Sequence, residues 1–235
     1  MLFNKNIEKI NSANYTIALV GNPNVGKSTI FNALTGMHQH TGNWPGKTVE
    51  NASGICNYKN KNYRLIDLPG TYSLMSHSEE EEIARNCICF GKSDALLIVV
   101  DATCLERNLN LVYQSLEITP NVILCVNLLD EAKRKGININ LDLLSKRLGI
   151  PVVGTIAKSK KTLKSLMSQV ENICTKKIHL SPIKLNYGVA IEESIEILEP
   201  LIHKQLTNAH SYLARWISIK LIEGDAKILS SISEQ

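Results

Sequence analysis

The sequence GNPNVGKS, residues 21–28, is the feature that most constrains how this chain folds. It directly follows the apolar run Ile17–Val20, and residues 28–34 after it have the spacing of a helix that ends at Gly36. A buried strand, a glycine-rich loop and a helix in this order are typical of the first unit of an α/β fold. The match to G-x-x-x-x-G-K-[ST] requires a loop whose backbone curls tightly between strand and helix.

Each residue type in this loop has a chemical reason. Glycines allow successive backbone N–H groups to point at one anion, and the following helix adds its free N–H groups and its dipole. Lys27 supplies a point charge for the β- and γ-phosphates, and Ser28 supplies a hydroxyl for Mg²⁺. The sequence therefore predicts a nucleotide-phosphate site formed by Gly21, Asn22, Pro23, Asn24, Val25, Gly26, Lys27, Ser28 and Thr29.

Strands and helices continue to alternate along the chain, which predicts a mostly parallel sheet flanked by helices. Continuous apolar runs are typical of strands buried on both faces of such a sheet. The strands are expected at residues 15–20, 54–58, 63–66, 95–100, 122–126 and from 151, with a hairpin turn at 59–62 and a long loop over 37–50. The further helices are expected at residues 79–90, 106–118, 141–148 and 163–174.

The hydrophobic pattern changes near residue 179. Apolar residues then recur at helical spacing over 191–202 and again over 213–220, which predicts a small all-α appendage. We therefore divide the chain into a lead-in at 1–14, an α/β domain at 15–178 and a helical domain at 179–235. No apolar run approaches the roughly 20 residues of a membrane helix, so the chain itself is expected to be soluble.

A second motif, Asn127-Leu128-Leu129-Asp130, follows the expected strand at 122–126. Asp130 could accept hydrogen bonds from N1–H and the 2-amino group of guanine, which adenine lacks. Asn127 would tie this loop to the base and to the loop at 21–28. The nucleotide is therefore expected to be GTP or GDP.

Two further motifs lie between these. Asp67-Leu68-Pro69-Gly70 ends the expected strand at 63–66, where Asp67 can reach Mg²⁺ through a water and the Gly70 N–H can bond the γ-phosphate. Thr48, in the loop at 37–50, is favoured by order and spacing to place its hydroxyl on Mg²⁺. Four motifs in this order resemble the translation-factor-like GTPase class, with a Ras-like P-loop fold.

That resemblance implies a fifth motif after the strand near 152–153, where a Ser-Ala pair usually contacts guanine. Here the stretch reads Gly154-Thr155-Ile156-Ala157-Lys158, so Thr155 and Ala157 are the candidate contacts and Ile156 replaces the usual Ser. Thr71, which directly follows Gly70, stands where many GTPases carry a water-positioning Gln, and slow intrinsic hydrolysis is therefore expected.

Three longer stretches resemble the ferrous iron transport protein B family. They are TGNWPGKTVE at 41–50, DLPGTYSL at 67–74 and VDATCLERNL at 100–109, and ARWISIKLIEGD at 214–225 extends the resemblance into the helical part. The resemblance implies a bacterial membrane protein with a cytosolic GTPase domain, a helical domain that favours bound GDP, and a membrane-spanning iron permease. This chain would then be the N-terminal part, on the cytoplasmic side of the inner membrane, with the permease of the same protein and small accessory iron-transport proteins as partners.

The family resemblance also assigns roles within the loop. Asn24 matches an Asn that coordinates K⁺ in the family, where the cation could speed hydrolysis. The alternative is that Asn24 only shapes the loop, because Asn tolerates a left-handed backbone. The resemblance thus implies Lys27, Asn24, Thr48 and Gly70 as catalytic groups, Ser28, Thr48 and Asp67 around Mg²⁺, and Asn24 on K⁺.

Composition limits the alternatives. Hydrophobic residues form 44% of the chain, enough for a sizeable core, and the charge is only +4, so no nucleic-acid partner is expected. A ribosome-assembly or other RNA-linked GTPase remains an alternative, and so does a nucleotide-bound scaffold with negligible turnover. The six cysteines are dispersed and fit a reducing compartment. His38 and His40, near the first switch, are interpreted as loop residues rather than as a metal site.

Overall fold

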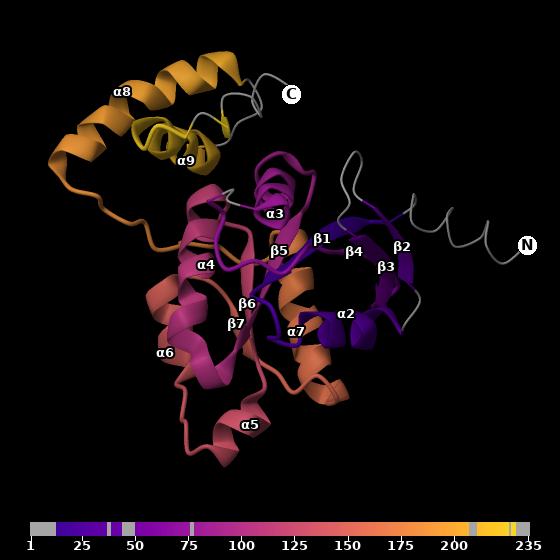
Figure 1. The fold of residues 1–235 in the computed structure, drawn as a ribbon. Helices are drawn as coiled ribbons and strands as arrows, with labels where there is room; N and C mark the ends of the chain where they lie inside the picture. Colours follow the sequence, from indigo (N-terminus) through magenta and orange to yellow (C-terminus); the bar gives the residue numbers. More distant parts are fainter. Residues whose placement is uncertain are drawn as a thin grey trace, which may run out of the picture.

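The computed structural model describes residues 13–36, 39–43, 50–75, 78–206, 211–225 and 227–228. These residues form a seven-stranded sheet with helices on both faces and a pair of helices beside it (Figure 1). The strands are β1 Tyr15–Gly21, β2 Gln39–Asn43, β3 Glu50–Tyr58, β4 Lys61–Asp67, β5 Ala95–Asp101, β6 Val122–Asn127 and β7 Val152–Gly154. The helices are α2 Lys27–Thr35, α3 Glu79–Phe90, α4 Leu105–Ile118, α5 Leu129–Arg134, α6 Leu141–Leu148, α7 Lys160–Cys174, α8 Val189–Gln205 and α9 Ser211–Ile222, with a 3₁₀ turn, η1, at Ala102–Cys104.

The strand order is β2-β3-β4-β1-β5-β6-β7, and β1 is the central strand. β1 pairs in parallel with β4, Tyr15 opposite Tyr63, and with β5, Ile17 opposite Ala95. β6 and β7 continue the parallel arrangement, whereas β3 is antiparallel to both β2 and β4. The carboxyl ends of the five parallel strands therefore meet at one edge, where α/β sheets hold their ligands.

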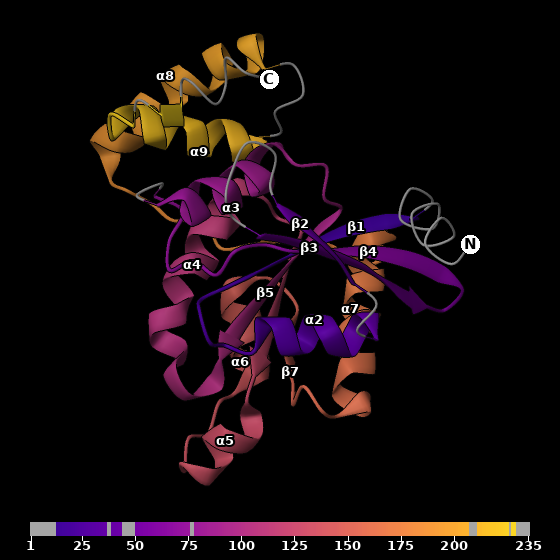
Figure 2. The same cartoon turned by 45° about the vertical axis from the view of Figure 1, so that its right-hand side comes forward.

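Helices cover both faces of the sheet, as the continuous apolar strands require. In β5, Leu96 and Ile98 face a core shared with α3, α4 and α6, while Leu97 and Val99 face a second core shared with α2 and α7. Figure 2 shows α2 and α7 on one side of the sheet and α4 and α6 on the other. Burial of each such Leu, Ile or Val contributes about 1.5–3 kcal/mol to folding.

The structure confirms the predicted alternation and most of the element positions. The hairpin between β3 and β4 turns on Lys59 and Asn60, which both have positive φ, 46° and 61°. Positive φ at both central residues defines a type I′ turn, which matches the twist of the flanking strands. α2 ends at Gly36 with φ 64°, the left-handed C-cap that the glycine predicts.

Two expectations about the elements were wrong. Residues 39–43, expected in a loop, form β2 at the edge of the sheet, and β3 begins at Glu50 rather than Gly54. The polar sequence QHTGN has no strand periodicity, and its strand conformation comes from backbone pairing with β3. The short helix α5 was not predicted, because six residues are too few for a clear period.

The helical appendage is a pair of helices, α8 and α9, that pack on each other, and α9 also packs on α4. Trp216 on α9 is 1% exposed and joins the core shared with α3 and α4. Bidentate contacts of 2.8 and 2.7 Å join Arg215 of α9 to Glu192 of α8, and Arg215 also donates to the Leu185 carbonyl. These bonds hold the incoming chain, α8 and α9 together.

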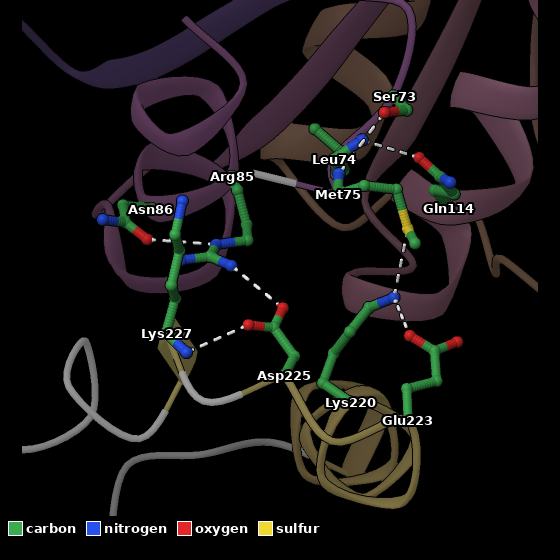
Figure 3. A network of polar contacts seen from close by, with 10 residues as sticks. All are labelled: Ser73, Leu74, Met75, Arg85, Asn86, Gln114, Lys220, Glu223, Asp225 and Lys227. Atoms are coloured by element: carbon green, nitrogen blue, oxygen red, sulfur yellow. Dashed lines mark hydrogen bonds and ion pairs between the residues drawn. The ribbon is translucent and has the colours of Figure 1, made fainter. Parts of the chain in front are cut away.

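Polar contacts connect α9 to Met75 of the segment that follows Gly70, and the chain just after α9 to α3 (Figure 3). The Leu74 N–H donates to Gln114 Oε1 of α4 at 2.7 Å, and Lys220 Nζ of α9 lies 3.5 Å from Met75 Sδ. Arg85 of α3 is fully buried and pairs with Asp225 at 3.3 Å. The helical pair is thus bonded to the segment expected to respond to the γ-phosphate.

Candidate nucleotide-binding site

The loop between β1 and α2 curls through two left-handed residues. Asn24 has φ 67° and Gly26 has φ 81°, and Gly26 is the N-cap of α2 without a side-chain hydrogen bond at the helix start. The first N–H groups of α2 therefore have no side-chain cap and lie at the carboxyl edge of the sheet. A helix start of this kind favours an anion such as phosphate.

Neighbouring atoms explain both glycines of the loop. A Cβ on Gly26 would lie 2.5 Å from Asn127 Nδ2, and a Cβ on Gly21 would lie 2.5 Å from the Val99 carbonyl oxygen. Either side chain would force the loop away from the strand that supports it. The loop is therefore packed against β5 and the end of β6.

Lys27, Ser28 and Asp67 come together at the start of α2. The Lys27 ammonium donates to Asp67 Oδ1 and, at 2.5 Å, to the Leu68 carbonyl oxygen, and the residue is only 9% exposed. The Ser28 hydroxyl lies 3.4 Å from Asp67 Oδ2. The Lys27 ammonium and the Ser28 hydroxyl therefore both contact the Asp67 carboxylate. Hydroxyl and carboxylate oxygens are ligands of the kind that Mg²⁺ prefers.

The Asn127 amide joins the guanine-motif loop to the loop at 21–28. Asn127 Nδ2 donates to the Val25 carbonyl oxygen at 3.0 Å, and Asn127 Oδ1 accepts from the Thr155 hydroxyl at 3.1 Å. Asn127 and Thr155 are fully buried. Two of the predicted motifs and the loop at 21–28 are therefore in direct contact, although they are far apart in the sequence.

Leu128 and Asp130 follow this contact. Leu128 has φ 62°, an uncommon conformation for a branched side chain, and it begins α5, whose first turn carries the exposed Asp130. Uncommon backbone conformations of non-glycine residues cluster at functional sites. This turn at Leu128 starts α5 directly after β6 and puts Asp130 in the first turn of that helix.

The fifth predicted motif is held by α7. The hydroxyl of Thr162 accepts from the Ile156 N–H at 3.3 Å and lies 3.1 Å from the Ile156 carbonyl oxygen. Ala157 follows in a half-buried turn. The Thr155 side chain contacts Asn127 from within the protein, so its hydroxyl supports the Asn127 amide.

The segment after β4 lies against the loop at 21–28. The Thr71 N–H donates to the Gly21 carbonyl oxygen at 3.2 Å, and a Cβ on Gly70 would lie 3.4 Å from Pro23. The Gly70 N–H has no hydrogen-bond acceptor among the described residues. This donor is therefore available beside the candidate phosphate site.

A buried amide in the loop also lacks partners. Asn22 is 2% exposed, and neither its Nδ2 nor its Oδ1 has a hydrogen-bond partner among the residues that the structure describes. Unsatisfied buried groups cost about 1–3 kcal/mol each. Together with the glycine-lined turn and the convergent Lys27, Ser28 and Asp67, this loop fits a polar ligand better than a purely structural turn.

Two residues of the first-switch region lie outside the described residues, namely Thr48 and His38. Within the described part, no group of three or more His, Cys, Asp or Glu side chains could hold a metal ion. The same part contains no helix long and apolar enough to cross a membrane.

Sequence reasoning missed three supporting residues. Asn108 Oδ1 accepts from the Asp101 N–H at 2.9 Å, Gln114 holds Leu74, and Thr162 holds the loop at Ile156. Asn108 lies in one of the stretches that carry the family resemblance, so its position there could have singled it out. Nothing in the local sequence marks Gln114 or Thr162.

Two family models match the chain. Residues 15–170 match the model of ferrous iron transport protein B, and residues 187–235 match the cytosolic helical domain of the same family. The chain is 39% identical over 221 residues to an Fe(2+) transport protein A/Fe(2+) transporter FeoB fusion protein of Porphyromonas gingivalis, and this covers 93% of the chain and 26% of the relative. It is 37% identical to the Fe(2+) transporter FeoB of Escherichia coli, over 89% of the chain and 27% of the relative.

A solved structure agrees with these matches. The cytosolic domain of the T. maritima FeoB iron transporter in a GDP form superposes with a TM-score of 0.82 at 36% identity, over 94% of this chain and 84% of that one. The alternative of an RNA-linked GTPase is not supported by these similarities. The chain spans about a quarter of the length of the curated relatives quoted above.

The paired matches, the identity with these relatives and the agreement of the folds show that this chain belongs to the ferrous iron transport protein B family and comprises its N-terminal G domain, of GTPase fold, with the helical domain that follows.

Proposed function

We propose that this chain binds GTP and GDP with Mg²⁺, hydrolyses GTP slowly to GDP and phosphate, and thereby regulates Fe²⁺ passage through the membrane part of a longer transporter. The observation that carries the proposal is the convergence of Lys27, Ser28 and Asp67 beside a loop bonded to Asn127. The GDP form of the T. maritima relative supports guanine nucleotide as the ligand.

The chain's own groups account for phosphate binding. Lys27 would exchange its bond with Asp67 for the β- and γ-phosphate oxygens, and the N–H groups at the start of α2 would face the same phosphates. Ser28 and Asp67 would hold Mg²⁺, with Thr48 as a further proposed ligand. When bound, Mg²⁺ supplies charge neutralisation on the phosphates.

The guanine base would be recognised by the loop at the end of β6. Asp130 would accept hydrogen bonds from the base. Asn127 would hold this loop at a fixed distance from the loop at residues 21–28, which we call the phosphate loop. The Ala157 N–H would contact the base from the other side. Because Ile156 is bonded through its backbone to Thr162, its side chain does not have to supply a hydrogen bond.

Slow hydrolysis is supported by the contacts of Thr71. Its hydroxyl donates to the Ser73 carbonyl oxygen at 2.6 Å, its N–H bonds Gly21, and the residue is 3% exposed. A side chain held in this way is not available to orient an attacking water. The Gly70 N–H would bond the γ-phosphate. Loss of the γ-phosphate on hydrolysis would therefore release the segment that contacts α9.

K⁺ stimulation rests on Asn24 and needs a test that separates side-chain chemistry from loop shape. Asn24 has φ 67°, so Asn24→Ala removes the amide and also introduces backbone strain, whereas Asn24→Gly removes the amide alone. GTP turnover is measured for the wild type and both variants in KCl and in NaCl at equal ionic strength. We expect K⁺ to raise the wild-type rate by about tenfold or more and to have no effect on either variant.

The other outcomes are equally informative. A K⁺ effect that persists in Asn24→Gly and disappears in Asn24→Ala would assign Asn24 to loop shape alone. An unchanged wild-type rate in the two salts, with GDP still bound, would exclude the cation role and favour a slow scaffold or an external activating protein. If the wild type binds no guanine nucleotide, the proposed function is wrong.

The transport role is supported by the relatives, which are named as Fe(2+) transporters and are more than three times as long as this chain. We propose that residues 15–178 form the GTPase domain and 179–235 a regulatory helical domain, at the cytoplasmic side of the bacterial inner membrane. The permease part of the same protein is the proposed partner. The fusion of transport protein A with FeoB in P. gingivalis also supports an accessory iron-transport protein as a partner.

A further inference from the structure

Cys125 lies at the end of a chain of hydrogen bonds that crosses the candidate site. Its Sγ is 3.1 Å from the Thr155 hydroxyl oxygen, which is 3.1 Å from Asn127 Oδ1. Asn127 Nδ2 in turn is 3.0 Å from the Val25 carbonyl oxygen. Strand β6, the loop after β7 and the phosphate loop are therefore linked by four groups in a row.

The Val25 carbonyl, at the far end of this chain from Cys125, sets the direction of every hydrogen bond in it. A carbonyl oxygen only accepts, so Val25 requires the amide nitrogen of Asn127 to face it, and the Asn127 oxygen then faces Thr155. This oxygen also only accepts, so the Thr155 hydroxyl uses its single proton on Asn127. The hydroxyl oxygen is then left to accept, and the donor facing it is the Cys125 thiol.

Burial keeps this donor in place. Cys125, Asn127 and Thr155 are all fully buried, so water does not compete for these groups. Burial raises the pKa of the Cys125 thiol to about 12, so the thiol keeps its proton at neutral pH. The amide does not turn over either, because its oxygen would then face the Val25 carbonyl oxygen, which has no proton to donate.

We infer that Cys125 is a positioning residue for guanine recognition, whose thiol donates the first bond of a one-way chain that orients Thr155 and, through it, the Asn127 amide. The inference rests on the proposed function, since Asn127 would carry the guanine-reading loop. Without the thiol as a donor, the Thr155 hydroxyl would be freer to turn. Asn127 and Asp130 would then be held less firmly relative to the phosphate loop.

The test uses inosine diphosphate, which lacks the 2-amino group that Asp130 would read. The affinity ratio of GDP to inosine diphosphate is measured for the wild type, Cys125→Val and Cys125→Ser. Valine has a similar volume and no donor, and we expect it to lower the ratio about two- to tenfold, the range expected for one hydrogen bond. Serine keeps a donor in the same direction and is expected to retain most of the ratio.

Two controls separate positioning from packing. Cys56→Val removes a buried thiol from the same core, in β3, away from Asn127, and should leave the ratio unchanged. Thr155→Val interrupts the chain one step further on, so adding Cys125→Val to it should cause no additional loss. Independent losses of the two variants in this double-mutant cycle would contradict the inference.

A second readout does not need nucleotide. Hydrogen exchange of the Asn127 side-chain amide, followed by NMR, should be faster in Cys125→Val than in the wild type and in Cys125→Ser. If the wild type binds GDP but Cys125→Val keeps both the ratio and the slow exchange, the inference fails and the proposed function stands. If the wild type binds neither diphosphate, the proposed function fails first, and the exchange rates alone decide whether the thiol positions Asn127.

Discussion

At the scale of single residues, the candidate site depends on backbone conformations that few residue types adopt. Asn24, Gly26 and Leu128 all have positive φ, and all three border the contact between Asn127 and the phosphate loop. A side chain at Gly26 would meet strain and a close neighbour at the same time. These two effects can be separated by experiment.

Gly26→Ala should weaken GDP binding by about tenfold or more, because its Cβ would lie 2.5 Å from Asn127 Nδ2 and would push the amide from Val25. Left-handed backbone adds about 1–2 kcal/mol of strain. Isothermal titration calorimetry with GDP measures the loss of affinity, and urea unfolding measures the loss of stability from backbone strain.

Gly136→Ala is the matched control for this variant. Gly136 has φ +72°, and a Cβ there would meet nothing within 4 Å. We expect it to lower stability by about 1–2 kcal/mol through backbone strain alone and to bind GDP as the wild type does. Equal GDP affinities for the two alanine variants would show that the contact with Asn127 does not matter.

Sequence alone predicted the residues of the site where a motif defines them. Lys27, Ser28 and Asp67 lie together, and Asn127 contacts the loop at 21–28 through the Val25 carbonyl oxygen. Cys125 was not singled out, because a buried cysteine in an apolar strand reads as a small hydrophobe, and only its distance to Thr155 distinguishes it. The role of each residue toward a nucleotide stays a prediction.

At the scale of elements, long periodic segments were predictable and short ones were not. The bounds of α3 and α6 agree with the predicted ones, since an N-cap Ser78 and a C-terminal Gly149 mark a start and an end. β2 depends on backbone pairing with β3, and its own polar sequence carries no local strand signal. α7 begins three residues before the predicted start at Leu163, because Lys160 to Thr162 are polar and carry no period.

The ion pair between Glu192 of α8 and Arg215 of α9 should stabilise the fold less in acid. Arg215 and the Tyr187 N–H both bond Glu192, and the Arg215 guanidinium holds the pKa of this carboxyl at about 2, below its ordinary 4.5. A depressed pKa stabilises the fold above the unfolded value, and this contribution is lost as pH falls toward about 2. Glu192→Gln should therefore be less stable than the wild type at neutral pH, with a difference that shrinks between pH 4.5 and 2.

Thermal unfolding of the two proteins across this pH range measures the difference directly, and other carboxyl groups cancel because both proteins contain them. A difference that stays constant down to pH 2 would mean that Arg215 does not lower the Glu192 pKa. A stability difference between the two proteins that grows as pH falls would contradict an ion pair between Arg215 and Glu192.

At the scale of the whole molecule, the helical pair and the α/β domain meet through a buried charge. Arg85 is fully buried on α3, and Asp225, just after α9, pairs with it at 3.3 Å (Figure 3). A buried guanidinium that loses a charged partner is costly, because its desolvation is no longer compensated. The contact therefore joins the two parts more firmly than a surface pair would.

Asp225→Asn should lower the free energy of unfolding by about 1–3 kcal/mol. Glu131→Gln is the control, since Glu131 pairs with Arg134 at 4.0 Å and both side chains are exposed, an arrangement worth about 1 kcal/mol or less. Urea unfolding of the three proteins gives both values. Similar losses in the two variants would show that burial of Arg85 does not set the strength of this contact.

The central position of β1 determines when the site can assemble during synthesis. A ribosome releases Tyr15–Gly21 early, but the neighbours of this strand, β4 and β5, follow many residues later. Val99, which lies next to Gly21, is part of β5, and Thr155, which contacts Asn127, emerges later still. Pairing between distant segments waits for the whole loop between them, so the nascent chain exposes an apolar strand without partners until β4 and β5 have emerged. The proposed nucleotide can therefore act as a folding ligand only after residue 155 has left the ribosome.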